Sequence, residues 1–130
     1  VAFLMFLFNR CYRVKQKSDL YPGLWEYQRP ELMWQTEKFT IRIDELGDGR
    51  YRYASWAKGK ALSDKPDLVL SNGAVRVEGT GGNHTYLFTS GPYRYECAVT
   101  VLGESGTPPS ELVVYQNEVA IMHQPVIKVL

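Results

Sequence analysis

The chain has 130 residues, of which 45% are hydrophobic, and a formal net charge of +1 at pH 7. This length suits one domain with one core. Because the charges nearly balance, electrostatics give no argument for nucleic acid as a partner, and an acidic or disordered class is excluded as well. Nine of the residues are tyrosine, which suits strands that have a half-wet face.

The N-terminal segment differs in composition from the rest. Residues 1–8 are continuously apolar, and basic residues follow at Arg10, Arg13, Lys15 and Lys17. Eight residues are too few to cross a bilayer, which takes about 20. We therefore divide the chain into residues 1–17, which we expect to be a buried central strand or an appendage, and a single β domain over residues 18–130. Association with a membrane is expected only if the apolar run is a truncated anchor.

Residues 18–37 form the least regular part of the sequence. Tyr21-Pro22-Gly23 indicates a turn. Pro30 is suited to the first position of a helix, so we expect at most one short helix near residues 30–37, with a loop as the alternative.

Strand patterns begin at residue 38. Phe39, Ile41 and Ile43 alternate with polar residues, and the alternation breaks at Gly47-Asp48-Gly49 before it resumes. Side chains of a strand point to opposite faces in turn, so this pattern predicts a hairpin of residues 38–46 and 50–57.

The remainder repeats this pattern. The expected strands are residues 67–71 and 74–78 around an Asn72-Gly73 turn, then 84–89, 93–102, 111–116 and 119–123, with an edge strand at 126–130 after Pro125. Short connections make neighbouring strands antiparallel. The fold class predicted is all-β, an antiparallel up-and-down meander of about eight or nine strands that closes into a small barrel or sandwich.

The two cysteines are Cys11 and Cys97. Cys97 is in phase with Tyr95 and Val99, the expected inward face of a strand, and buried free cysteine is common. We therefore favour unpaired thiols over a disulfide. No His/Cys grouping has the spacing of a zinc site, and we expect no metal and no cofactor.

Catalytic motifs are not apparent. The histidines are His84 and His123, and neither has a nucleophile and a carboxylate at a catalytic spacing. Asp44 and Asp67 leave open a hydrolytic site with two carboxylates. The glycine-rich stretch at residues 79–84 lies between two expected strands, so a wide turn is favoured over a phosphate loop. The prediction is that the chain is not an enzyme.

The excess of aromatic residues favours a non-enzymatic binding or interaction domain, of bacterial origin, with protein or carbohydrate as the ligand. Its contacts are expected from Tyr51, Tyr53, Trp56, Gly82, Asn83, His84, Tyr93 and Tyr95. An alternative is a structural subunit that forms a homo-oligomer by adding residues 1–8 to another subunit's sheet. The sequence leaves the compartment open, with the cell envelope or secretion slightly favoured over the cytoplasm.

Two tetrapeptides carry a resemblance to a known family. Trp56-Ala57-Lys58-Gly59 and Ser90-Gly91-Pro92-Tyr93 resemble two short signatures of the bacterial membrane-bound lysozyme inhibitors, which are small eight-stranded barrels. The two elements stand in the reverse order here, and the family's cysteine pattern is missing. The resemblance implies an envelope inhibitor that inserts residues 90–93 into the cleft of its target.

Overall fold

The alternating segments of the sequence form nine antiparallel strands in the computed structural model, which describes residues 19–79, 81–101 and 110–130. The expectations for residues 1–17, including Cys11, lie outside the described residues. The elements in chain order are the 3-10 turn η1 (Pro22–Leu24), β1 (Arg29–Gln35), β2 (Phe39–Gly47), β3 (Arg50–Ala57), β4 (Leu68–Glu78), β5 (Asn83–Ser90), β6 (Tyr93–Val99), β7 (Glu111–Gln116), β8 (Val119–Pro125) and β9 (Lys128–Val129).

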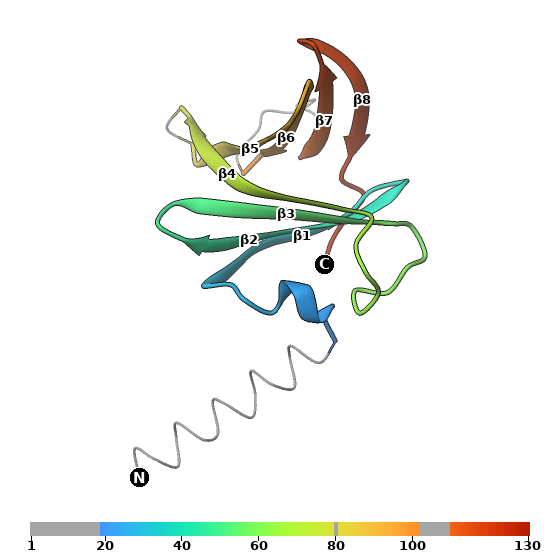
Figure 1. The fold of residues 1–130 in the computed structure, drawn as a ribbon. Coiled ribbons are helices and arrows are strands. Elements are labelled where there is room, and N and C mark those ends of the chain that lie inside the picture. Colours follow the sequence, from blue (N-terminus) through green and yellow to red (C-terminus); the bar gives the residue numbers. More distant parts are fainter. Residues whose placement is uncertain (1–18, 80, 102–109) are drawn as a thin grey trace.

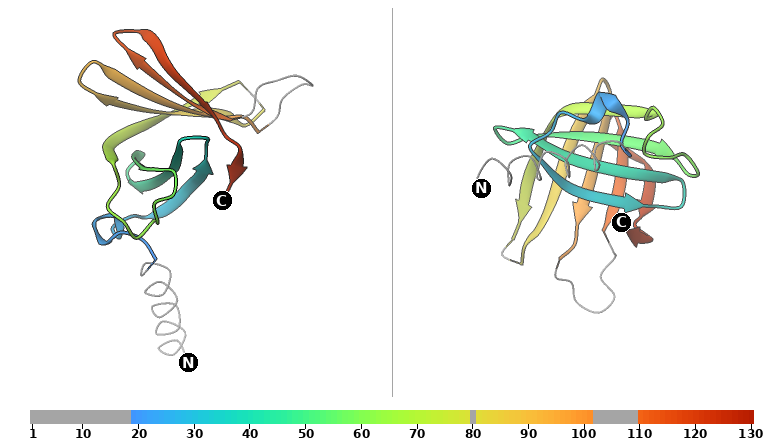
Figure 2. Two further views of the ribbon diagram at one scale, coloured as in Figure 1. Left: turned by 90° about the vertical axis from the view of Figure 1, so that its right-hand side faces the viewer. Right: turned by 90° about the horizontal axis from the view of Figure 1, so that it is seen from below.

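The strands form one curled sheet in the order β8-β7-β6-β5-β4-β3-β2-β1-β9. Every strand from β1 to β8 pairs with its neighbour in sequence, which is the expected result of short connections. The sheet bends into a half-barrel, so that β5 to β8 lie over β1 to β3 (Figures 1 and 2). The prediction of an all-β antiparallel meander is confirmed.

The predicted turn at Asn72-Gly73 is wrong, because these residues lie inside the continuous strand β4. Asn72 has a positive φ of 63°, and the register slips beside it: Tyr51 of β3 faces Gly73, whereas Tyr53 faces Leu70. The residues are therefore a bulge rather than a hairpin. Before the bulge β4 pairs with β3, and after it β4 pairs with β5. The positive φ that suits a hairpin turn also suits a bulge, so the dipeptide alone could not distinguish them.

The helix expected near residues 30–37 is replaced by strand β1. Leu32 and Trp34 alternate onto the face that joins the core. Pro30 lies where the register of β1 against β2 shifts, between Pro30 and Leu32. A missing N–H is tolerated at such an irregularity, so the proline does not prevent the strand.

The core lies between the two halves of the bent sheet. Tyr53 of β3 contacts the rings of Phe88 and Tyr95, with ring centroids 5.6 Å and 5.5 Å apart. Cys97 is fully buried in the same cluster and is a free thiol. A second, smaller cluster lies on the outer face of β3, where Trp56 packs with Leu20 and Leu24 of the N-terminal part of the domain. Strand β3 is thus buried on both faces, which its alternating sequence did not predict.

The C-terminal residues join the two edges of the sheet. Strand β8 pairs with β7 at one edge, and β9 pairs with β1 at the other. Between them, the N–H of Val126 donates to the Ser110 carbonyl (2.8 Å) and that of Ile127 to the Gln35 carbonyl (2.9 Å). The edge strand expected within residues 126–130 is therefore present as β9.

Replacing Gly73 with alanine is expected to lower the free energy of unfolding by about 1–3 kcal/mol, because the new Cβ would overlap the Phe88 ring. Urea unfolding of the variant measures the change. Phe88→Leu is the matched background: the cost of Gly73→Ala should shrink there, since the clashing ring is gone. An equal cost in both backgrounds would show that the ring is not the cause.

Candidate ligand-binding site

Aromatic rings gather at one end of the inner face. The rings of Tyr51 and Tyr86 meet edge to face with centroids 5.0 Å apart, and His84 meets Tyr86 in the same way at 5.3 Å. The Tyr86 hydroxyl donates to Glu31 Oε2 at 3.1 Å. Tyr86 is the residue of this group that was not predicted, although its alternation with His84 and Phe88 places all three on the same face of β5.

Two half-buried carboxylates surround this end of the sheet. Glu31 and Glu45 both pair with Arg29, at 3.2 Å and 2.8 Å. Burial, and then the Glu31 carboxylate, raises the pKa of the Tyr86 hydroxyl, and burial with the charges of Glu31 and Glu45 raises the pKa of Tyr51. Both hydroxyls are therefore harder to ionise than the hydroxyl of a solvent-exposed tyrosine.

The glycine-rich connection lies next to these rings. Gly82 has a positive φ of 85°, and its carbonyl is 2.8 Å from His84 Nδ1. The Asn83 side-chain oxygen accepts the Val101 N–H at 2.7 Å. These contacts hold the start of β5 beside Val101. The fold thus brings Tyr51, Asn83 and His84 to the same end of the molecule.

The other predicted aromatic residues are dispersed. Tyr53 is buried in the core and Tyr95 is partly buried beside it. Tyr93 begins β6 at the exposed turn of residues 90–93. Trp56 is fully buried on the opposite face, where its Nε1 donates to the Asp64 carbonyl at 2.8 Å. The described structure therefore contains no continuous face made of all the predicted tyrosines and Trp56.

The two segments that resemble lysozyme inhibitors lie in different parts of the fold. Residues 56–59 span the end of β3 and the start of the next connection, and residues 90–93 span the turn from β5 to β6. Gly59 and Gly91 both have positive φ, at 96° and 58°, so both segments are turns that favour glycine. Inhibition of a lysozyme stays a prediction.

Asp44 and Asp67 do not form the carboxylate pair that hydrolysis would need. Asp44 lies in β2 and is buried against two arginines. Asp67 precedes β4, where it accepts from Lys60 Nζ (2.5 Å) and the Ala57 N–H (2.7 Å). The Lys60 ammonium and that N–H hold the pKa of Asp67 below its usual value. Asp44 is thus engaged by two cations and Asp67 by a different one.

The Asp44 cluster anchors residues 20–28 to the outer face of the sheet. Arg42 Nε donates to both oxygens of Asp44 (3.1 and 2.9 Å), and Arg52 Nη2 donates to Oδ2 (3.0 Å). Arg52 also donates to the carbonyls of Leu24 (2.9 Å) and Glu26 (3.0 Å). The three side chains together carry two positive charges and one negative charge.

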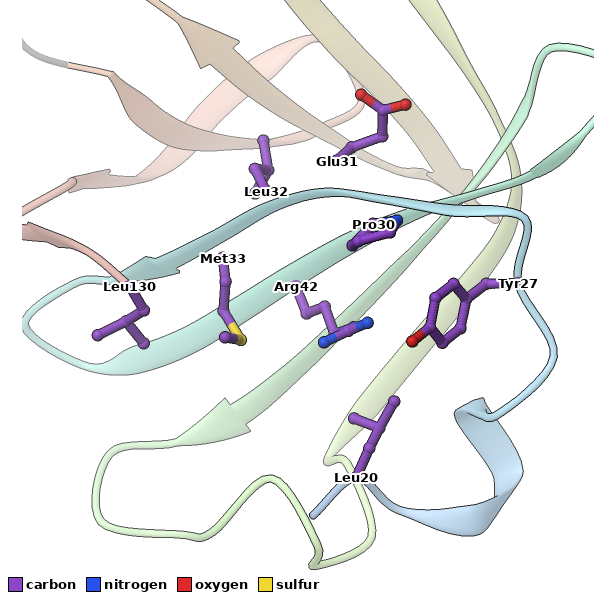
Figure 3. Close-up of a pocket in the computed structure, with 8 residues that line it drawn as sticks. All are labelled: Leu20, Tyr27, Pro30, Glu31, Leu32, Met33, Arg42 and Leu130. Atoms are coloured by element: carbon purple, nitrogen blue, oxygen red, sulfur yellow. The ribbon is translucent and has the colours of Figure 1, made fainter. Parts of the chain in front are cut away.

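A pocket of about 310 Å³ opens beside this cluster, and we call it the outer pocket (Figure 3). Its lining residues are Leu20, Tyr27, Pro30, Glu31, Leu32, Met33, Arg42 and Leu130. The Arg42 guanidinium lies 5.1 Å from the centre of the Tyr27 ring. Figure 3 shows Arg42 between Met33 and Tyr27, with the Glu31 carboxylate turned toward the other side of β1. Aliphatic side chains and a cation thus line one open pocket.

The sequence alone indicates that Arg42, Asp44 and Arg52 come together. Arg42 and Asp44 are two residues apart, which puts them on one face of a strand. The predicted hairpin around residues 47–49 places Arg52 opposite Asp44, as the observed register confirms. The pocket itself needs residues 20–27 and Leu130, which are far from β2 in sequence.

Comparisons of the chain with known protein families, with curated proteins and with solved structures found no match. Within the described residues, no three His, Cys, Asp or Glu side chains are grouped so that they could hold a metal ion. The part of the chain that the structure describes also contains no helix with the length and apolar character needed to cross a membrane.

Replacing Asp44 with asparagine is expected to lower the free energy of unfolding by about 3–5 kcal/mol, because it leaves two buried guanidiniums without their carboxylate. Asp67→Asn is the matched control, since Asp67 pairs with Lys60 at the surface and should have a small effect. Chemical denaturation measures both variants. Equal effects would contradict the structural role assigned to Asp44.

Proposed function

We propose that the chain is a non-enzymatic binding domain that holds a small organic molecule in the outer pocket. The observation that carries the proposal is the pocket itself, in which aliphatic side chains and a guanidinium line one hollow of mixed polar and apolar surface. Ligand sites in proteins are typically concave, of about 300–1,000 Å³, and mostly apolar with a few placed polar groups. The outer pocket, at about 310 Å³, is at the lower end of that range, so a small ligand is expected.

Hydrogen bonds within the chain hold the walls of the pocket in place. The N–H of Gln28 donates to the Glu45 carbonyl (2.8 Å), and that of Tyr21 donates to the Leu62 carbonyl (2.9 Å). Trp25 Nε1 donates to the Leu20 carbonyl at 2.7 Å. These bonds hold residues 20–28 together and tie them to β2 and to the connection after β3. A preformed pocket supports binding, because little ordering free energy is lost when a ligand enters.

The aromatic end of the inner face supports a ligand site less well. Tyr51 and Tyr86 pack on each other and are both buried, at 9% and 4% exposure. Tyr53, deeper in the core, is 1% exposed. Rings that already fill the core offer little surface to a sugar or a protein. The outer pocket therefore replaces the aromatic face as the proposed site.

A fragment screen by NMR tests the proposal. Small organic fragments of mixed charge should shift the amide signals of Met33, Arg42 and Leu130 in the isotope-labelled chain. Met33→Trp should abolish these shifts because the indole fills the pocket, whereas Val119→Trp, at an exposed site on β8, should retain them. A library that shifts no signal of the pocket residues would refute the proposal, as would equal shifts in Met33→Trp.

Assembly through strand β8 is a second candidate, favoured by the exposed apolar residues of the C-terminal segment. Of these, Val119 and Ile121 lie on β8. Strand β8 lies at the edge of the sheet, and its residues 119–124 contain no Lys, Arg, Asp or Glu. Edge strands are usually protected by such charges, because an unprotected edge pairs with another strand. The partner proposed is β8 of a second copy, which would meet it without repulsion between like charges.

Light scattering over a range of concentrations tests this assembly. The chain should reach the mass of a dimer as concentration rises, and Ile121→Lys should return it to a monomer by placing like charges at the interface. Thr89→Lys, at an exposed position of the interior strand β5, should leave the dimer intact. A monomer at every concentration would exclude pairing through β8.

A further inference from the structure

The charges beside the outer pocket do not cancel. Asp44 is the carboxylate shared by Arg42 and Arg52, so the three side chains retain one positive charge. The side chains are only 12%, 2% and 7% exposed for Arg42, Asp44 and Arg52. A charge withdrawn from water is costly unless an opposite charge or several hydrogen bonds accompany it. The carbonyls of Leu24 and Glu26 supply such hydrogen bonds to Arg52, and the net positive charge of the cluster is complementary to an anion.

Arg42 is the cation that an anion in the pocket would meet. Arg52 donates from both Nη atoms to the carbonyls of Leu24 and Glu26 and to Asp44. Arg42 instead engages Asp44 through Nε. Its guanidinium end lies among the pocket residues in Figure 3. The planar, paired N–H groups of a guanidinium match the two oxygens of a carboxylate.

The remaining walls of the pocket require an apolar body on the ligand. Leu20, Met33 and Leu130 present aliphatic surface near Arg42. Glu31 also lines the pocket, but its carboxylate is engaged by Arg29 and by the Tyr86 hydroxyl. The carboxylate is turned to the other side of β1 in Figure 3, so it does not neutralise Arg42.

We infer that the outer pocket selects small carboxylic acids with an apolar chain, the carboxylate at Arg42 and the chain against Met33 and Leu130. This inference rests on the proposed function, which makes the pocket a ligand site, and adds the charge of the ligand. Selection follows from the surplus positive charge, whereas affinity for the apolar chain follows from burial of aliphatic surface.

Three probes that share one alkyl chain separate these contributions: octanoate, 1-octanol and octylammonium. Affinities come from NMR titration of the pocket amides in the intact chain. Octanoate should bind about 10- to 100-fold more tightly than octanol, since a hydrogen bond to a charged group contributes about 1.5–3 kcal/mol. Octylammonium should bind most weakly. Added salt should weaken octanoate and leave octanol unchanged.

Arg42→Met removes the surplus charge and leaves Asp44 paired with Arg52. The variant should lose the preference for octanoate and keep its affinity for octanol, whereas Arg42→Lys should retain part of the preference. Circular dichroism checks that each variant is folded. If a variant does not fold, the salt dependence of octanoate binding to the unaltered chain tests the role of charge instead. Equal binding of octanoate and octanol by the unaltered chain overturns the inference and leaves the proposed function standing. If no probe shifts the pocket signals, the inference is refuted, and the fragment screen decides the proposed function separately.

Discussion

The bulge at Asn72 and Gly73 is the constraint on which the rest of the fold depends. It lets β4 pair with β3 along its first part and with β5 along its second, so one sheet lies on both sides of one core. Gly73 carries no side chain, and the Phe88 ring occupies the space that a Cβ would need. The contact of Phe88 with Tyr53 then joins the two halves. A straight β4 would leave both inner faces without a partner.

Local sequence patterns predicted most strands. They were insufficient where one sequence pattern is compatible with two local structures. The hairpin within residues 38–57 is predicted correctly, because the alternation of apolar residues and the turn residues both indicate it. Asn72-Gly73 satisfies both a hairpin and a bulge, and only the pairing of β4 with two neighbours distinguishes them. For residues 30–37, Pro30 favours the start of a helix, with a loop as the alternative, yet residues 29–35 form strand β1 and place Trp34 in the core.

The candidate site was less predictable than the fold, because it forms between segments distant in sequence. Aromatic composition indicated a binding face, but Trp56 became buried once residues 20–24 packed on the outer side of β3. That packing depends on Arg52, whose contacts with Leu24 and Glu26 cross from β3 to the N-terminal part of the domain. Spacing could have placed Arg42 and Asp44 together, whereas nothing local places Leu20 and Leu130 at one pocket.

The position of β9 has a consequence for the order of events during synthesis. From β1 to β8, each strand pairs with the next strand along the chain. These hairpins can therefore form while the chain is still emerging from the ribosome. The pairing of Trp34 with Val129 and of Gln35 with Lys128 instead spans nearly the whole domain. Contacts of such long sequence separation slow folding, because a large loop must close first. The edge of β1 therefore stays open until residues 128–129 have emerged from the ribosome, and closure of the sheet is a late step of its folding.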